Sequence, residues 1–567
     1  MYSRERSDSA AARRERPFFV NERLHSTAVK TTSTLAILLL AAAAFAAEPP
    51  PAPNERWSHL QLGNITVYGN AGDRTLRTVA ENLVRFRDTV AQVQRIPVQS
   101  PLPTYVYVFQ NEASFAPYRI AAVGKRSPDV VGVFAQQAGA NWMLIQARSD
   151  VAFDRLVYHE LTHYFIRNTL PGVRPWLDEG LAGFYETFAP MGRSNVVTIG
   201  KPPYKYLDVL RQMGLMPLPE LFAQHPLRDH SSSDPRVTQF YLQSWLLVHY
   251  LLIGNPERGA ALGPFLAELD EGKSLERSFA DAFHMKMEDL NGELSAYLRR
   301  DRFNMIQYTV AASGDKIGEP AAMPREETFF VLGNLLAHTD PAAGAEAFLT
   351  QAVRLNPNNG AATAALARVK SIAGNSDEAR QLYEKAIAVA GKDPRPYVAA
   401  SLHTVAALQR RARDGEHVER AEVEKARGQA MTALSLAPDD VLANAILGAT
   451  YTFAGEEPKK GIAASRRAFE LAPSMLDVAA DLVLLYARSG LPALATDVID
   501  RVLVPSGDDQ YLAEARENLA LADYFRAEEL LQANEKGQAR TLLDRAAKAT
   551  VNEKLKAKIA AARGGAS

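Results

Sequence analysis

Two histidines one helical turn apart, with a glutamate after the first, are the residues of this sequence best suited to chemistry. They are His159, Glu160 and His163 in the stretch VYHELTHYF, residues 157–165. At 3.6 residues per turn, His159 and His163 share one face of a helix, and Glu160 lies about 100° round from them. Neutral imidazoles on a face turned away from water are good metal ligands. A pair of hydrogen-bonded core histidines gives the same pattern, so the motif alone leaves both interpretations open.

The neighbouring residues predict the helix that positions this pair. Asp150 is a suitable N-cap, and Pro171 followed by Gly172 stops the helix. Three apolar residues share the histidine face, namely Leu156, Ile166 and Leu170. An apolar stripe of this kind indicates a buried helix face.

A third metal ligand is predicted at Glu179 in RPWLDEGLAGFYETF, a segment in which Pro175 is a suitable first helical residue. Burying a carboxylate in such an apolar segment is costly unless it is paired or bound to a metal. A loop of about ten residues between two antiparallel helices would bring Glu179 opposite the histidines. Two imidazoles and one carboxylate leave a fourth tetrahedral position open, as a catalytic zinc requires. Asp178 is the alternative ligand in this segment.

Composition narrows the classes of function. The 567 residues are enough for two or three domains, and 47% hydrophobic residues leave ample material for a core. The chain has no cysteine, so any metal must be held by histidine and carboxylate. A formal net charge of −1 gives no electrostatic case for binding nucleic acid or an anionic membrane.

The combination HELTH…PWLDEGLAGFYE resembles the gluzincin metallopeptidases, in which His-Glu-x-x-His is followed by a helix carrying the third ligand. The likeness extends from about Trp57 to Arg302, and a bacterial subgroup uses a Trp-x-x-Glu-Gly-x-Ala segment to supply that ligand. The resemblance implies that His159, His163 and Glu179 bind Zn²⁺. It also implies that Glu160 is the general base of a zinc-dependent peptidase acting on a peptide or protein substrate.

The resemblance is less specific for the residues around this set. Tyr241, in FYLQSW, is similar in position to the tyrosine with which gluzincin aminopeptidases stabilise the oxyanion, and His230 and His249 are alternatives for that role. Gly183 stands where many gluzincins carry an acid, while Glu186 lies on the same helix face and could orient a histidine. The aminopeptidase motif Gly-x-Met-Glu-Asn is absent from the sequence, so specificity for a free N-terminus is not implied.

The segment before the histidine helix has mixed α/β character. A helix is predicted over 75–93, a strand over TYVYVFQ (104–110), and a hairpin of VVGVFAQQ and NWMLIQAR with its turn at Gly139. The NWMLIQAR strand could border the cleft and hold an extended peptide by β-addition. We therefore expect an α+β, thermolysin-like zincin domain over 57–305, with a small N-terminal mixed sheet plus helices.

The chain from about residue 326 is helical and periodic. Prolines in short turns recur at Pro357, Pro394, Pro438 and Pro473, with spacings of 37, 44 and 35 residues. These spacings resemble the 34-residue tetratricopeptide repeat (TPR), with an insertion in the charged stretch 410–424. We expect an all-α TPR solenoid over 326–510 and a helical capping unit over 511–567. The resemblance implies that the repeats recruit a protein partner or substrate.

Residues 1–47 have the pattern of a secretory signal peptide. Lys30 precedes the apolar run LAILLLAAAAFAA (35–47), and a Pro-rich linker follows over 48–56. Cleavage is predicted after Ala46, which leaves no stable membrane span; the alternative is an uncleaved N-terminal anchor. The prediction is therefore an exported protein, periplasmic or extracellular in a bacterium.

Two hypotheses of different class follow. The first is an exported zinc metallopeptidase whose repeats bind a protein. The second is a TPR scaffold of the cell envelope whose metal domain is inactive or structural. The presence of Glu160 beside an open set of three ligands favours the first, because a structural site needs no base and is normally closed. The site chemistry fixes only metal-assisted hydrolysis, so the hydrolysed bond stays open.

Overall fold

The computed structural model describes residues 53–565 apart from 97, 99–101, 125–131, 138, 148–154, 193, 225–233, 342–343, 414–415 and 454–455. The predicted signal peptide with its cleavage site at Ala46 lies outside the described residues. So do the predicted N-cap Asp150 and the oxyanion candidate His230.

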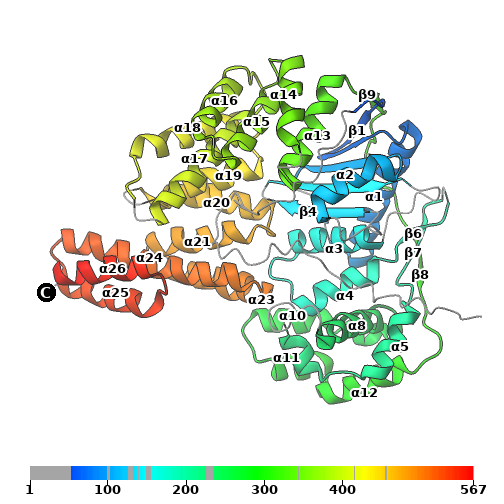
Figure 1. Ribbon diagram of the computed structural model, residues 1–567. Coiled ribbons are helices and arrows are strands. Elements are labelled where there is room, and N and C mark those ends of the chain that lie inside the picture. The colour runs from blue at the N-terminus through cyan, green and yellow to red at the C-terminus, as the bar shows by residue number, and fades with distance from the viewer. Residues whose placement is uncertain are drawn as a thin grey trace, which may run out of the picture.

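A six-stranded mixed sheet forms the first part of the fold, in the order β4-β5-β3-β2-β1-β9 (Figure 1). Its strands are β1 (Ser58–Leu62), β2 (Ile65–Gly69), β3 (Thr104–Phe109), β4 (Gly132–Gln137), β5 (Ala140–Gln146) and β9 (Ala321–Ala322). Strand β3 runs parallel to β2 and to β5, and the other pairs are antiparallel. The predicted strand at 104–110 and the predicted hairpin are confirmed, and Gly139 makes the turn with a φ of 84°.

The edge of this sheet differs from the prediction. Strand β5 pairs with β4 on one side and with β3 on the other, so its backbone groups are used inside the sheet. The prediction that NWMLIQAR borders the cleft is therefore wrong. Among the described strands β4 pairs only with β5, and it is β4 that contacts the histidine helix α3 (Arg155–Thr169).

Helices follow the sheet and complete the first part of the fold. They are α1 (Asp73–Gln94), α2 (Glu112–Val123), α3 (Arg155–Thr169), α4 (Pro175–Tyr185), α5 (Tyr204–Met213), α6 (Leu218–Ala223), α8 (Pro235–His249), η1 (Tyr250–Gly254), α9 (Pro256–Gly259), α10 (Leu262–Asp270), α11 (Leu275–Phe283) and α12 (Met287–Leu298). A second, three-stranded sheet consists of β6 (Ala189–Pro190), β7 (Val196–Ile199) and β8 (Ile306–Thr309). Because β8 and β9 pair with earlier strands, this fold continues past the predicted end at residue 305.

Helical hairpins make up the rest of the described chain. They are α13 (Arg325–Thr339), α14 (Ala345–Leu355), α15 (Gly360–Ile372), α16 (Ser376–Ala388), α17 (Arg395–Arg413), α18 (Arg420–Leu436), α19 (Val441–Ala449), α20 (Pro458–Leu471), α21 (Leu476–Arg488), α22 (Pro492–Val498), η2 (Ile499–Leu503), α23 (Val504–Ser506), α24 (Asp509–Gln532), α25 (Lys536–Ala549) and α26 (Glu553–Gly565). Each predicted proline turn falls between two helices, because proline cannot continue one. The predicted insertion lengthens α17 and its connection to α18. No described helix is both long enough and apolar enough to cross a membrane.

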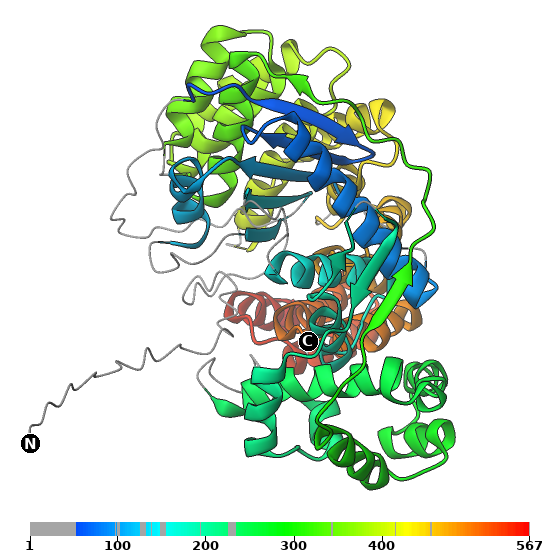
Figure 2. The ribbon, with the colours of Figure 1, turned by 90° about the vertical axis from the view of Figure 1, so that its right-hand side faces the viewer.

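The solenoid lies directly against the first part of the fold (Figure 2). One face of the sheet shares a core with α1 and α3, while the alternate residues of β3 and β5 share a second core with α2 and α13–α15. Tyr107 donates a hydrogen bond from its hydroxyl to the carbonyl of Val331, at 3.0 Å. The Trp142 ring stacks on His338 with ring centroids 4.4 Å apart. Part of the surface of α13–α15 is therefore covered by the sheet of the same chain.

Candidate metal centre

Helices α3 and α4 supply the predicted metal ligands, and only residues 170–174 separate them. This connection is shorter than the ten-residue loop that the sequence suggested. Ile166 is fully buried as expected, but Leu156 is 40% exposed and Leu170 is 37% exposed. The predicted apolar stripe is therefore wrong at both of its ends, because Leu156 lies in the exposed first turn of α3 and Leu170 lies beyond its last residue.

Three donor atoms converge between these helices. The Nε2 atoms of His159 and His163 lie 3.2 Å apart, and each lies 3.4 Å from Oε2 of Glu179. All three side chains are buried. The structure thus brings together the three residues that the sequence proposed as ligands, and among the described residues they form the one cluster with this geometry.

The other ring nitrogens each face a second carboxylate. His163 Nδ1 lies 2.9 Å from Oδ1 of Asp178, and His159 Nδ1 lies 3.4 Å from Oε2 of Glu186. Arg167 donates to the second oxygen of Asp178 at 2.8 Å, and Arg155 pairs with Glu186. Asp178 and Glu186 therefore each contact the Nδ1 side of a histidine, whereas Glu179 is the carboxylate that lies beside both Nε2 atoms.

These contacts determine where the protons are in the neutral form of the site. A carboxylate only accepts hydrogen bonds, so the Nδ1 atoms of His159 and His163 carry the protons. Their Nε2 lone pairs then point toward one position, which Oε2 of Glu179 also faces. Beyond these two ring nitrogens, Glu179 Oε2 has no hydrogen-bond partner among the described residues. Three converging lone pairs in a buried place repel one another unless a cation lies between them.

The spacing of the donors fits a transition-metal ion. Bonds of about 2.0–2.2 Å in a tetrahedral site separate the ligand atoms by about 3.3–3.5 Å, close to the separations observed here. The donor types, two imidazoles and one carboxylate, suit zinc. In donor type and in spacing, His159, His163 and Glu179 therefore fit such an ion.

The pKa values of His159 and Glu179 are shifted in the metal-free site. Burial lowers the pKa of His159, but the carboxylates of Glu179, Glu186 and Glu160 outweigh burial and hold it well above its ordinary value. Burial raises the pKa of Glu179, yet the two histidines bring it well below its ordinary value. These shifts favour a protonated His159 beside an ionised Glu179 when no metal is bound.

The remaining candidates divide into two groups. Glu160 is half-buried beside His159 and makes no hydrogen bond or ion pair with another described residue. Tyr241 is buried on α8, where its ring packs edge-to-face on Phe240 at 5.7 Å, and it does not belong to the converging set. The base role of Glu160 and the oxyanion role of Tyr241 both stay predictions.

His249 is a structural residue, which corrects its place among the oxyanion candidates. It is fully buried, and its Nε2 lies 3.1 Å from the carbonyl oxygens of Gly200 and Asn304. Its Nδ1 lies 2.9 Å from the hydroxyl of Tyr297. Burial lowers its pKa to about 4, so the ring is neutral and already has partners for both nitrogens.

Two glycines of α4 lie where α8 packs closely against it. A Cβ on Gly183 would lie 3.2 Å from Cδ1 of Trp245, and a Cβ on Gly180 would lie 2.6 Å from the carbonyl oxygen of Ser244. Helix α8 therefore leaves no room for an acidic side chain at position 183, and the carboxylates that contact the histidines are those of Asp178 and Glu186. Sequence reasoning missed Asp178 in this role; Arg167, one turn after His163, was the available signal.

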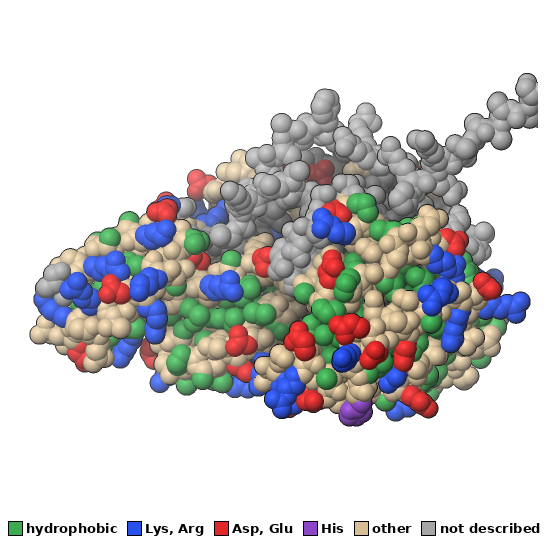
Figure 3. Space-filling view, turned by 90° about the horizontal axis from the view of Figure 1, so that it is seen from below, with side chains coloured by type: hydrophobic (Ala, Val, Ile, Leu, Met, Phe, Trp, Pro, Cys, Tyr) green, Lys and Arg blue, Asp and Glu red, His purple; other side chains and the backbone are tan. Residues whose placement is uncertain are grey.

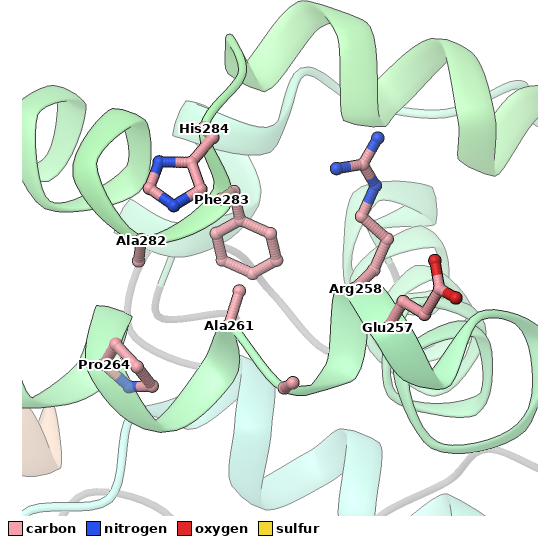
Figure 4. Close-up of a pocket in the computed structure, with 8 residues that line it drawn as sticks. Glu257, Arg258, Ala261, Pro264, Ala282, Phe283 and His284 are labelled. Carbon is pink, nitrogen blue, oxygen red and sulfur yellow. The ribbon is translucent and has the colours of Figure 1, made fainter.

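A separate cavity of about 280 Å³ lies beside α9, α10 and the end of α11 (Figure 4). His284 and Glu257 are among the polar residues that line it, and Arg258 is paired with Glu293. None of its lining residues belongs to the metal cluster. This cavity is therefore separate from the candidate metal centre between α3 and α4.

Comparison with known proteins bears on the solenoid. Residues 340–401, from the end of α13 into α17, match the tetratricopeptide repeat family. Residues 340–401 therefore contain tetratricopeptide repeats. The TPR prediction is confirmed here, and the match indicates protein–protein interaction as the role of the region. No curated protein matches the chain.

Solved structures with similarity to the chain include two TPR proteins. One is a thermophilic TPR protein of Thermus thermophilus, 18% identical over 42% of this chain and 98% of its own, with a TM-score of 0.25. The other is YrrB, described as a TPR protein with an unusual peptide-binding site, 17% identical over 33% of this chain and 90% of its own, with a TM-score of 0.27. With TM-scores this low, the two structures say nothing about the ligands of this chain.

Proposed function

We infer that this protein is a zinc-dependent hydrolase of peptide bonds with its active centre between α3 and α4. The observation that carries the proposal is the convergence of the two Nε2 atoms and Glu179 Oε2 at 3.2–3.4 Å, with both histidines backed by carboxylates. The HELTH…WLDEG segments, similar to those of gluzincins, support the assignment to peptidases. Carboxylates behind metal-ligating histidines are typical of a working zinc centre.

In this proposal each residue of the site has its own role. His159, His163 and Glu179 would hold the ion, which when bound supplies Lewis-acid polarisation of a water and of the scissile carbonyl. Glu160, next to His159 and outside the ligand set, accepts a proton from the attacking water and passes it to the leaving amine. Asp178 and Glu186 fix the ring orientation of the two histidines. Burial of the cluster excludes bulk water and strengthens each of these interactions.

The repeats and the N-terminal segment complete the proposal. Part of the solenoid contacts its own sheet, so a protein partner or substrate has to use the surface that remains, including α24–α26, which project to one side (Figure 1). Export across a membrane is proposed from residues 1–47 alone.

Variants of the base and of a ligand test the function. Zinc content and cleavage of casein and of a peptide library are measured for the wild type, Glu160→Gln and Glu179→Ala. We expect Glu160→Gln to keep zinc and lose about 10²–10⁴-fold in rate, the usual contribution of general acid–base catalysis. We expect Glu179→Ala to lose zinc affinity as well. Full cleavage by Glu160→Gln would contradict the assigned base, and a zinc-binding wild type that cleaves nothing favours the scaffold hypothesis.

A further inference from the structure

The solenoid contacts the end of the metal-binding helix at two places that the proposed function leaves unexplained. One is Ser474, in the turn between α20 and α21. The other is η2 (Ile499–Leu503), a short π-helical segment between α22 and α23. Both lie more than 300 residues after α3 in the sequence, and both meet the chain where α3 ends and the connection to α4 begins.

The first contact is a hydrogen bond to a buried residue of α3. Asn168 is 2% exposed, and its Oδ1 accepts from Ser474 Oγ at 2.8 Å. Its Nδ2 donates to the carbonyl of Tyr164 at 2.7 Å, so the same side chain also caps the last turn of the helix. Ser474 thereby fixes the side chain that closes α3 five residues after the ligand His163.

The second contact involves Gly172, in the connection between the two ligand-bearing helices. Its φ is +71°, and an added Cβ would lie 2.5 Å from the carbonyl oxygen of Arg501 and 3.2 Å from Cα of Val502. Backbone therefore packs on backbone with no room for a side chain. A glycine is required here both for conformation and for the close approach.

The short connection makes these contacts important for the metal centre. Residues 170–174 join the helix of His159 and His163 to the helix of Glu179. A shift of this segment changes the relation of the carboxylate to the two imidazoles, whose donor atoms must stay within tenths of an ångström of their positions. The core around α3 also includes solenoid residues, among them Met475 and Val478.

We propose that Ser474 and η2 of the solenoid are positioning elements of the metal centre, acting through Asn168 and Gly172. The repeat array in this chain is thus part of the device that sets metal affinity, in addition to any partner that it binds. The inference rests on the proposed function, since it concerns the same three ligands.

The test measures zinc affinity of the full-length chain for Gly172→Ala and Ser474→Ala. We expect each variant to bind zinc about tenfold more weakly, as with other losses of support behind ligands, at an unchanged unfolding midpoint for Ser474→Ala. Ser474→Thr, which keeps the hydroxyl, restores the affinity. Two control variants make the same kinds of substitution at positions that do not contact α3 or its connection to α4. Gly490→Ala has a similar φ of +74° and open space around it, and Ser435→Ala removes an exposed hydroxyl whose partner is Thr432.

A second readout separates this inference from the function it rests on. In the metal-free protein, we expect faster hydrogen exchange of the amides over 163–170 in Gly172→Ala and Ser474→Ala than in the wild type. A wild type that binds no zinc overturns the proposed function, and the inference with it, even if exchange changes. Wild-type zinc affinity in folded Ser474→Ala overturns the inference alone. If Gly172→Ala does not fold, Ser474→Ala decides.

Discussion

At the scale of single residues, the centre depends on which side of each imidazole faces a carboxylate. Asp178 and Glu186 contact the Nδ1 atoms, and this leaves the Nε2 atoms of His159 and His163 free for the ion that we propose. Arg167 and Arg155 in turn hold the two carboxylates. The ligands are therefore pre-oriented through two layers of charged contacts.

We expect the loss of either carboxylate behind the histidines to weaken zinc binding. Asp178→Asn and Glu186→Gln keep the size of the side chain but lose the charged acceptor behind a histidine. We expect zinc affinity to fall about 10–100-fold in each variant. Titration calorimetry measures the change, and Glu293→Gln, which removes the partner of Arg258 outside the cluster, is the control. Unchanged affinity in both variants would contradict the role given to these carboxylates.

Zinc binding is expected to depend on pH with a definite sign. The pKa of His159 is raised in the metal-free fold, so near neutral pH the ring holds a proton that zinc must displace. Binding therefore releases protons, and apparent affinity increases as pH rises toward the raised pKa. Calorimetry in buffers of different ionisation enthalpy measures the protons released. Proton uptake on binding would contradict this account.

The convergence of the three proposed ligands could be predicted from the sequence, but the contacts behind them could not. His159 and His163 follow from a spacing of four residues, and Glu179 from a carboxylate in an apolar segment. Asp178 and Glu179 are adjacent in sequence, so their roles depend on the rotation of α4 about its axis. That rotation is set by the packing of α4 against α8, and no local sequence pattern indicates this packing.

At the scale of elements, the close approach of α4 and α8 holds the helix of Glu179. A Cβ on Gly180 would lie 2.5 Å from Cγ2 of Val248 and 2.6 Å from the carbonyl oxygen of Ser244. The backbones are thus in direct contact, and the apolar residues of α4 are buried around them.

Gly180→Ala is therefore expected to destabilise the protein although alanine favours helix. The methyl group forces α4 and α8 apart, at a cost of about 1–3 kcal/mol. The matched control is Gly292→Ala in the middle of α12, where nothing lies within 4 Å, and it should stabilise by up to about 1 kcal/mol. Denaturant unfolding measures both. Equal effects of the two substitutions would show that the helices do not approach as described.

Repeating elements were the most predictable part of the fold. Prolines at 357, 394, 438 and 473 mark turns because they cannot continue a helix, and each turn lies where expected. The edge of the sheet was less predictable. NWMLIQAR forms β5, which is paired on both sides, and the pairing with β3 depends on a strand that the local sequence does not indicate.

At the scale of the whole molecule, the solenoid and the sheet share a core. The aromatic face of the sheet contacts α13 and α15. Trp142 of β5 lies in this contact and is 1% exposed. This arrangement joins residues more than 200 positions apart, as in the bond from Tyr107 to Val331, and no local pattern reports such a distance. On the face seen in Figure 3, acidic and basic side chains are interspersed.

This shared core is expected to weaken in acid. Burial lowers the pKa of His338, which stacks on Trp142, from 6.5 to about 3. The folded form resists protonation, so stability is lost as pH falls below 6.5. His338→Phe keeps the stacking and removes the titration. Between pH 6.5 and 5, denaturant unfolding should show that the wild type loses about 1–2 kcal/mol more stability than the variant. Equal losses would contradict this contribution.

The central claim is that His159, His163 and Glu179 together bind one zinc ion. The most direct test is zinc X-ray absorption spectroscopy on the full-length protein after reconstitution and removal of excess metal at neutral pH. We expect a retained ion with two imidazoles among its ligands and oxygen atoms for the rest. A protein that retains no zinc, or an ion whose ligands do not include two imidazoles, would contradict the claim.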